Sequence, residues 1–95
     1  MLLAKVVGTV VSSSTNIGID GARFLLIDKC NQSGQKKGDY LIALDLIGAA
    51  NDELVMISES TSARETITTA GKPVDAIIIG IIDLIDENEN IIYKK

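Results

Sequence analysis

The apolar run from Val74 to Asp83 constrains the fold more than any other segment of the sequence. Successive side chains of a β-strand point to opposite faces. One face of this run carries Val74, Ala76, Ile78, Gly80 and Ile82, and the other carries Asp75, Ile77, Ile79, Ile81 and Asp83. Both faces are largely apolar, so both need cover. Strands of this kind are usual in parallel sheets with helices on both sides, but this chain offers at most one short helix.

Two sources of cover are possible for the second face. If one face fills the interior of a small barrel, the outward isoleucine row that contains Ile79 could contact another subunit. Alternatively, a short helical turn and the segment Ile91–Ile92 could cover that row within the chain. We favour the contact between subunits, because one small core cannot bury all the aliphatic surface of a chain this short.

The remaining apolar segments also favour strands. Hydrophobic residues make up 46% of the chain but aromatic residues only 3%, so the core must consist of aliphatic and largely β-branched side chains, which suit a pleated sheet. The expected strands are Leu2–Val11, Ala22–Cys30, Asp39–Leu46, Glu53–Ser58 and Val74–Asp86, and Ile91–Tyr93 is a candidate edge strand.

Polar and glycine-containing segments separate these strands. Ser12–Asn16, Asn31–Gly38 and Gly48–Asp52 read as loops. The residues Ser62-Ala63-Arg64-Glu65 have the spacing of a capping box, which predicts one short helical turn. We therefore predict an all-β fold in a single domain of residues 1–95: a small five-stranded OB-like Greek-key barrel with one short helical turn.

Composition argues against several classes of function. Nine basic and thirteen acidic residues give a net charge of −4, which disfavours nucleic acid and anionic membranes as partners. The longest apolar stretch, Ala76–Ile85, is interrupted by Asp83 and is far shorter than the roughly 20 residues that span a bilayer. The N-terminal residues do not resemble a signal peptide. We expect no membrane partner and no export.

The sequence also lacks the usual groups for catalysis or metal binding. It has no histidine, and its single cysteine, Cys30, reads as a small apolar residue suited to a reducing cytoplasm. The acidic residues Asp83, Asp86, Glu87 and Glu89 lack the spacing of a calcium loop. We predict no catalytic residue, no cofactor and no metal. The alternative function is that of an OB-type module that binds single-stranded nucleic acid. Such modules stack bases on aromatic side chains, and the only aromatic residues of this chain are Phe24, Tyr40 and Tyr93.

Four segments carry a resemblance to a known family. Lys5 to Ser12, with Val6, Gly8 and Val10, resembles the opening of the vertex proteins of bacterial microcompartments, of the ethanolamine-utilisation and carboxysome type. The other matches are the turn that contains Asp45, Gly48 and Ala49, the turn Ser62-Ala63-Arg64, and the closing strand with Asp75, Ile79, Gly80 and Asp83. The family turn usually has further glycines where this chain has Ala50 and Asp52, and the stretch Asn16–Ile19 lacks the family's usual lysine and leucine.

The resemblance implies a structural role. It implies a cyclic homopentamer without a catalytic group, placed in the bacterial cytoplasm at the corners of a polyhedral shell, where hexameric shell proteins meet. The motif residues listed above are then candidates for the contact between subunits.

Overall fold

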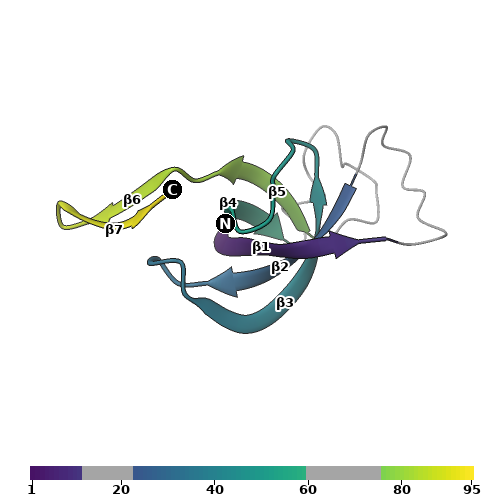
Figure 1. The fold of residues 1–95 in the computed structure, drawn as a ribbon, viewed down its shortest axis with the longest axis horizontal. Helices are drawn as coiled ribbons and strands as arrows, with labels where there is room; N and C mark the ends of the chain where they lie inside the picture. Colours follow the sequence, from purple (N-terminus) through teal and green to yellow (C-terminus); the bar gives the residue numbers. More distant parts are fainter. Residues whose placement is uncertain (12–22, 60–75) are drawn as a thin grey trace.

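A computed structural model describes residues 1–11, 23–59 and 76–95, which form seven β-strands. The predicted loop Ser12–Asn16 and the predicted helical turn at Ser62–Glu65 lie outside the described residues, as do Val74 and Asp75. The strands are β1 (Leu2–Val10), β2 (Arg23–Cys30), β3 (Lys36–Asp45), β4 (Leu54–Glu59), β5 (Ala76–Ile81), β6 (Leu84–Glu87) and β7 (Asn90–Lys94), as Figure 1 shows.

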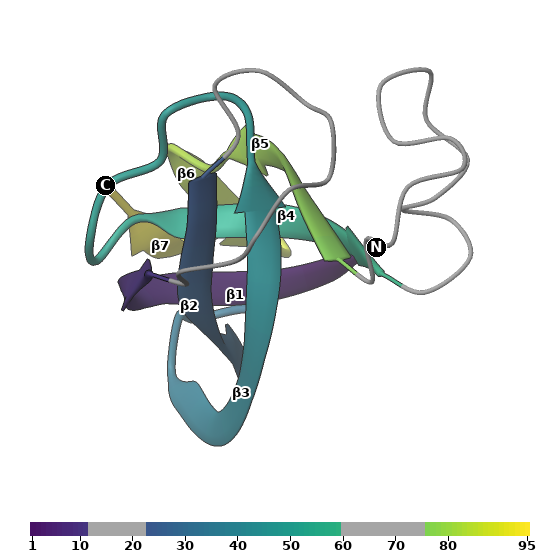
Figure 2. The ribbon, with the colours of Figure 1, turned by 90° about the vertical axis from the view of Figure 1, so that its right-hand side faces the viewer.

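Five of these strands close into a barrel in the order β1-β2-β3-β5-β4, with β4 pairing back to β1 (Figure 2). Every neighbouring pair is antiparallel except β3 and β5, which are parallel and, among the described residues, pair at Leu44 and Ile77. The predicted all-β barrel is therefore confirmed. Within the described residues there is no helix.

The barrel interior is built from aliphatic side chains, as the shortage of aromatic residues predicted. Alternation places Leu25 and Ile27 of β2 inside the barrel, where they are at most 2% exposed. The same core cluster contains Ala4, Val6, Leu25, Ile27, Ala43, Ala49, Val55, Ile57, Ala76 and Ile78.

Two β-bulges break the alternation expected along β1 and β5. Val7 lies at a register shift, so Val6 opposes Ile27 inside the barrel whereas Gly8 opposes Leu26 on the outer side. Ile79 likewise lies at a shift, because Ile78 pairs with Ile57 while Gly80 pairs with Met56. A bulge places an extra residue on one strand and redirects the side chains that follow.

The predicted outward row on β5 is consequently incomplete. Ile79 is 36% exposed, but Ile77 is only 5% exposed and Ile81 packs against the core. Of the three outward isoleucines expected from simple alternation, only Ile79 is exposed. The bulge at Ile79 turns Ile81 inward, opposite the buried Val55, whereas Ile77 precedes the bulge and is buried beside its register partner Leu44.

The predicted fifth strand, Val74–Asp86, is also shorter than expected. β5 ends at Ile81, and after Ile82 and Asp83 the chain enters the antiparallel hairpin β6–β7, which projects from the barrel in Figure 1. Ile91–Tyr93 does lie in a strand, but β7 pairs with β6 and not with the barrel. β3 begins at Lys36, so the loop predicted for residues 31–38 is shorter than expected.

Candidate functional site

The turn after β3 is organised around the buried carboxylate of Asp45. Its Oδ1 accepts hydrogen bonds from the backbone N–H groups of Ile47 and Gly48, both at 3.1 Å, and its Oδ2 accepts one from the N–H of Ala49 at 3.1 Å. Gly48 has a φ of +84°, a conformation that glycine adopts without strain. These features explain the aspartate and the glycine of the motif, and Ala49 is a small residue buried in the core cluster.

Arg23 at the start of β2 provides the counter-charge for Asp45. Its Nη2 donates to Oδ2 of Asp45 at 2.6 Å and to the carbonyl oxygen of Ala49 at 2.9 Å. Arg23 and Asp45 are register partners across β2 and β3. Arg23 is not among the candidate residues predicted from the sequence, because only the strand register identifies it as the partner.

The electrostatic environment lowers the pKa of Asp45 below its ordinary value. Burial alone would raise this pKa, but the hydrogen bond from the Arg23 side chain and those from Ile47 and Gly48 outweigh burial. A lowered pKa in the folded state adds stability at pH values above the unfolded pKa, and this contribution is lost as the pH falls through the folded pKa.

We therefore expect Asp45 to contribute to the acid sensitivity of the fold. Stability should fall as the pH is lowered below about 4, near the pKa of an aspartate in the unfolded chain. The Asp45→Asn variant should lose less stability than the wild type over the same interval, because an amide does not titrate. Urea denaturation between pH 7 and pH 3, at a fixed protomer concentration, measures the difference. Identical pH profiles for the two proteins would contradict this expectation.

The residues that follow this turn, Asp52 and Glu53, form a second set of contacts, with β1 and with Lys95. Glu53 accepts a hydrogen bond from the N–H of Ala50 through Oε1 at 2.6 Å and forms an ion pair with Lys95 through Oε2 at 2.5 Å. The N–H of Asp52 donates to the carbonyl oxygen of Val6 at 2.8 Å. Asp52 has a φ of +67°, so it occupies a left-handed conformation where the family usually has glycine.

The other motif residues lie at several separate places. Val6 is in the core, whereas Gly8 and Val10 oppose Leu26 and Phe24 on the outer side of the barrel. Gly80 lies beneath Met56, since a Cβ atom added there would be 2.9 Å from the Met56 methyl carbon. The side chain of Asp83 is exposed. The remaining motif residues Ser62, Ala63, Arg64 and Asp75 lie outside the described residues.

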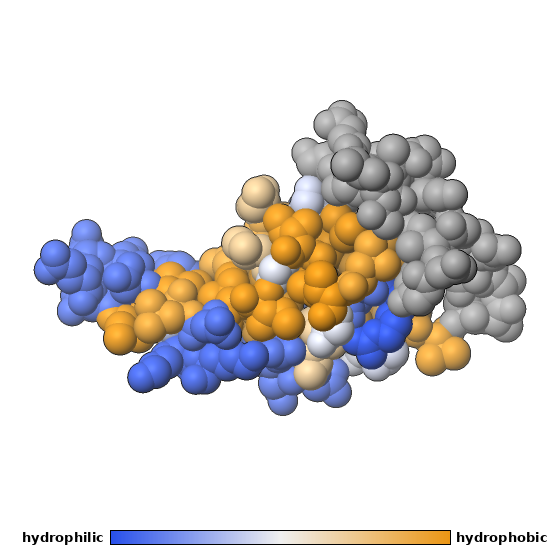
Figure 3. Space-filling view, turned by 90° about the horizontal axis from the view of Figure 1, so that it is seen from above, coloured by the Kyte–Doolittle hydropathy of each residue, from blue (hydrophilic) through white to orange (hydrophobic). Residues whose placement is uncertain are grey.

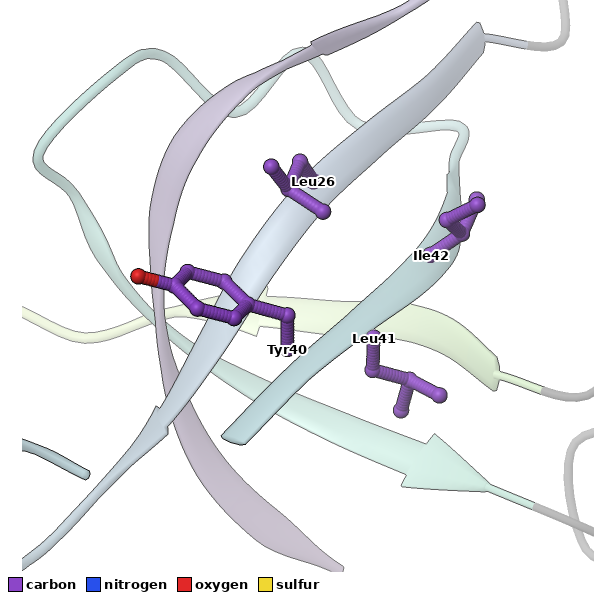
Figure 4. Close-up of a pocket in the computed structure, with 4 residues that line it drawn as sticks. All are labelled: Leu26, Tyr40, Leu41 and Ile42. Atoms are coloured by element: carbon purple, nitrogen blue, oxygen red, sulfur yellow. The ribbon is translucent and has the colours of Figure 1, made fainter. Parts of the chain in front are cut away.

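A shallow apolar groove lies on β2 and β3. It has a volume of about 460 Å³ and is lined by Leu26, Tyr40, Leu41 and Ile42. Figure 4 shows Leu26 and Ile42 beside each other on the two strands, as their register requires, whereas Leu41 belongs to the side that packs against the core. The groove has no titratable group other than the Tyr40 hydroxyl, so it suits apolar contact better than chemistry.

The described residues outside these features bring together no reactive constellation. Cys30 is buried, and burial raises the pKa of its thiol, which keeps it protonated. In residues 1–11, 23–59 and 76–95, no three Cys, Asp or Glu side chains are placed to hold a metal ion. The same ranges contain no helix with the length and hydropathy to cross a membrane. Fold and site together define a small structural or binding β-barrel.

Comparison with known proteins identifies the family. The family model described as "Ethanolamine utilisation protein EutN/carboxysome" matches residues 1–83. The carboxysome shell vertex protein CcmL of Thermosynechococcus vestitus is 35% identical over 95 residues, which cover all of this chain and 96% of that protein. The chain therefore belongs to the EutN/CcmL family, which consists of structural shell vertex proteins and not of enzymes.

Solved structures of relatives have the same fold. CcmL of Nostoc sp. PCC 7120 matches with a TM-score of 0.90 and 38% identity, over the full length of both chains. The pentameric microcompartment shell protein GrpN of Rhodospirillum rubrum matches with a TM-score of 0.79 and 33% identity, over 92% of this chain and 99% of that one. These relatives do not favour the nucleic-acid-binding alternative.

Proposed function

We propose that this protein forms a homopentamer that closes the vertices of a polyhedral microcompartment shell in the bacterial cytoplasm. The observation that carries the proposal is the match over the whole chain to CcmL, a shell vertex protein. The pentameric state of GrpN, a relative of similar length, supports a ring of five copies. The partners of this ring would be further copies of the chain and the hexameric proteins of the shell facets.

Geometry explains why such a shell needs a second type of unit. Hexagonal units fill a plane, so a closed polyhedron made from them requires five-fold units where its curvature concentrates. A ring of identical subunits requires a heterologous contact, in which two different patches of each subunit meet. Neither requirement involves a catalytic group, which agrees with the composition of the chain.

Deletion of the gene in a cell that makes the hexameric proteins tests this function. Because contacts between hexamers are untouched, flat or tubular sheets should still form, but their ends and corners should stay open and small intermediates should escape. Electron microscopy of the deletion strain, with the wild-type gene restored as a control, shows the outcome. Closed shells without this protein, in a cell with no second vertex protein, would refute the proposal.

Within the ring, we propose that Ile79 contributes to the contact between subunits. It is an aliphatic side chain, and the bulge in β5 directs it away from the core. Replacing Ile79 by Lys places a charge in an apolar contact, which is costly unless the charge is paired. We expect Ile79→Lys to shift the protein from rings to monomers in native mass spectrometry, and Ile79→Val to keep the ring. A folded Ile79→Lys variant of unchanged oligomeric mass would exclude this residue from the contact.

A further inference from the structure

The outer side of β2 and β3 presents an exposed apolar surface with a shallow groove. Gly8, Leu26 and Ile42 form one row across β1, β2 and β3, because Leu26 is the register partner of both other residues. Gly8 adds no side chain to this row, and Ile42 is 50% exposed. Tyr40, further along β3, is 61% exposed and lines the groove described above. A monomer would leave this apolar surface in water.

The hairpin β6–β7 carries a second exposed apolar surface. Its inner side is held by Tyr93, whose ring lies against Gly34, since a Cβ atom added to Gly34 would be 3.2 Å from Cδ2 of Tyr93. Ile85 pairs with Tyr93 and shares that side, so Leu84 and Ile91 face the other way, together with their register partners Lys94 and Asp86. These two residues are 48% and 59% exposed.

A projecting hairpin of this kind benefits from additional cover. An isolated two-stranded hairpin is marginally stable in water at best. Figure 3 shows apolar side chains continuing from the barrel onto the base of the hairpin, whereas its tip is hydrophilic. The combination of a projecting apolar face and a hollow apolar face suits a heterologous contact between two copies.

The charges around the two surfaces are complementary. The hairpin tip carries the exposed acidic residues Asp86, Glu87 and Glu89, and β3 begins with the exposed Lys36 and Lys37. Opposite charges at the rim of a contact set its orientation and favour the correct partner. The tip of one hairpin would thus lie near the start of β3 in the neighbouring copy.

We propose that the outer face of the hairpin, defined by Leu84 and Ile91, packs into the β2–β3 groove, defined by Leu26, Tyr40 and Ile42, of the next copy in the ring. This inference rests on the proposed homopentamer and specifies its contact. The occupant is a second copy of this chain, because a pentameric relative of one-third identity assembles from copies of itself. The contact repeats around the ring, so each copy supplies one hairpin and one groove.

A charge-exchange experiment on the full chain tests this pairing. Ile42→Lys and Ile91→Glu each place one uncompensated charge in the contact, because the register partner of Ile91 is itself acidic, Asp86, so each should raise the protomer concentration at half-dissociation by about tenfold or more. The double variant Ile42→Lys/Ile91→Glu should recover much of the ring, since the two new charges meet across each contact. Added salt should weaken the recovered ring more than the wild-type ring. Native mass spectrometry across a dilution series provides the measurement.

Val11→Glu is the matched control, because Val11 is an apolar residue that is 92% exposed and outside both surfaces. It should leave the ring intact, and circular dichroism should show that all variants fold. If the wild type forms a ring and both single variants keep it, this pairing is wrong while the proposed function stands. If both single variants dissociate and the double variant shows no recovery, the pairing is also wrong. A monomeric wild type would remove the proposed function and this inference together.

Discussion

Asp45→Ala is expected to lower the free energy of unfolding by about 3 kcal/mol. The substitution removes the acceptor for the three turn N–H groups and leaves the Arg23 guanidinium without its carboxylate. Breaking a buried ion pair on one side costs about 3–5 kcal/mol. We place the effect at the lower end because the side chain of Arg23 is half exposed and can be hydrated. Urea denaturation at pH 7 and a fixed protomer concentration measures the change.

Two control variants separate the contributions to this effect. Arg23→Ala should cost only about 1 kcal/mol, because Asp45 keeps its three backbone donors and the exposed guanidinium contributes little. Asp45→Asn should lie between the two, since one acceptor oxygen remains. If Asp45→Ala costs less than 1 kcal/mol, the turn is not held by this carboxylate.

Ile57→Ala should have an effect of similar size for a different reason. Ile57 is fully buried and lies between Leu2 on β1 and Ile78 on β5, at the closure of the barrel. Truncation of a buried isoleucine to alanine typically costs 2–5 kcal/mol because a cavity is left, and we expect about 3 kcal/mol here. The Ile57→Val variant should cost about 1 kcal/mol.

Urea denaturation again measures the change. An unchanged dependence of the unfolding free energy on urea concentration would indicate that the folded and unfolded states are otherwise similar to those of the wild type. The protomer concentration must be constant, because ring formation adds to apparent stability. Equal losses for Ile57→Ala and Ile57→Val would contradict a tightly packed site. The losses measured for Asp45→Ala and for the two Ile57 variants then show how much the polar turn and the apolar core each contribute to stability.

Local sequence patterns were sufficient to predict most of the barrel. The predicted strands Leu2–Val11, Ala22–Cys30 and Glu53–Ser58 lie close to β1, β2 and β4, and the shortage of aromatic residues correctly predicts an aliphatic core. The motif at Asp45 was selected through the family resemblance, and in the structure its residues serve one turn. These features depend on neighbours in the chain.

The features that sequence missed depend on partners that are distant in the chain. The bulges at Val7 and Ile79 arise from register with β2 and β4, and no local pattern signals them. The end of β5 at Ile81 was hidden because the apolar run continues to Ile85, although the backbone leaves the barrel earlier. The contacts of Asp45 with Arg23 and of Glu53 with Lys95 likewise join residues that only the fold brings together.

Closure of the barrel has a consequence for the rate at which the chain folds. β1 pairs with β4, where Leu2 meets Ile57, and β4 must still pair with β5 before the ring of strands is complete. Pairings between distant segments must wait for large loops to close, and barrels dominated by such pairings fold in milliseconds to seconds. During synthesis, β1, β2 and β3 emerge before β4 and β5 and expose their inner apolar faces. Until the residues of β5 leave the ribosome, the unfinished barrel is therefore open to aggregation through these faces.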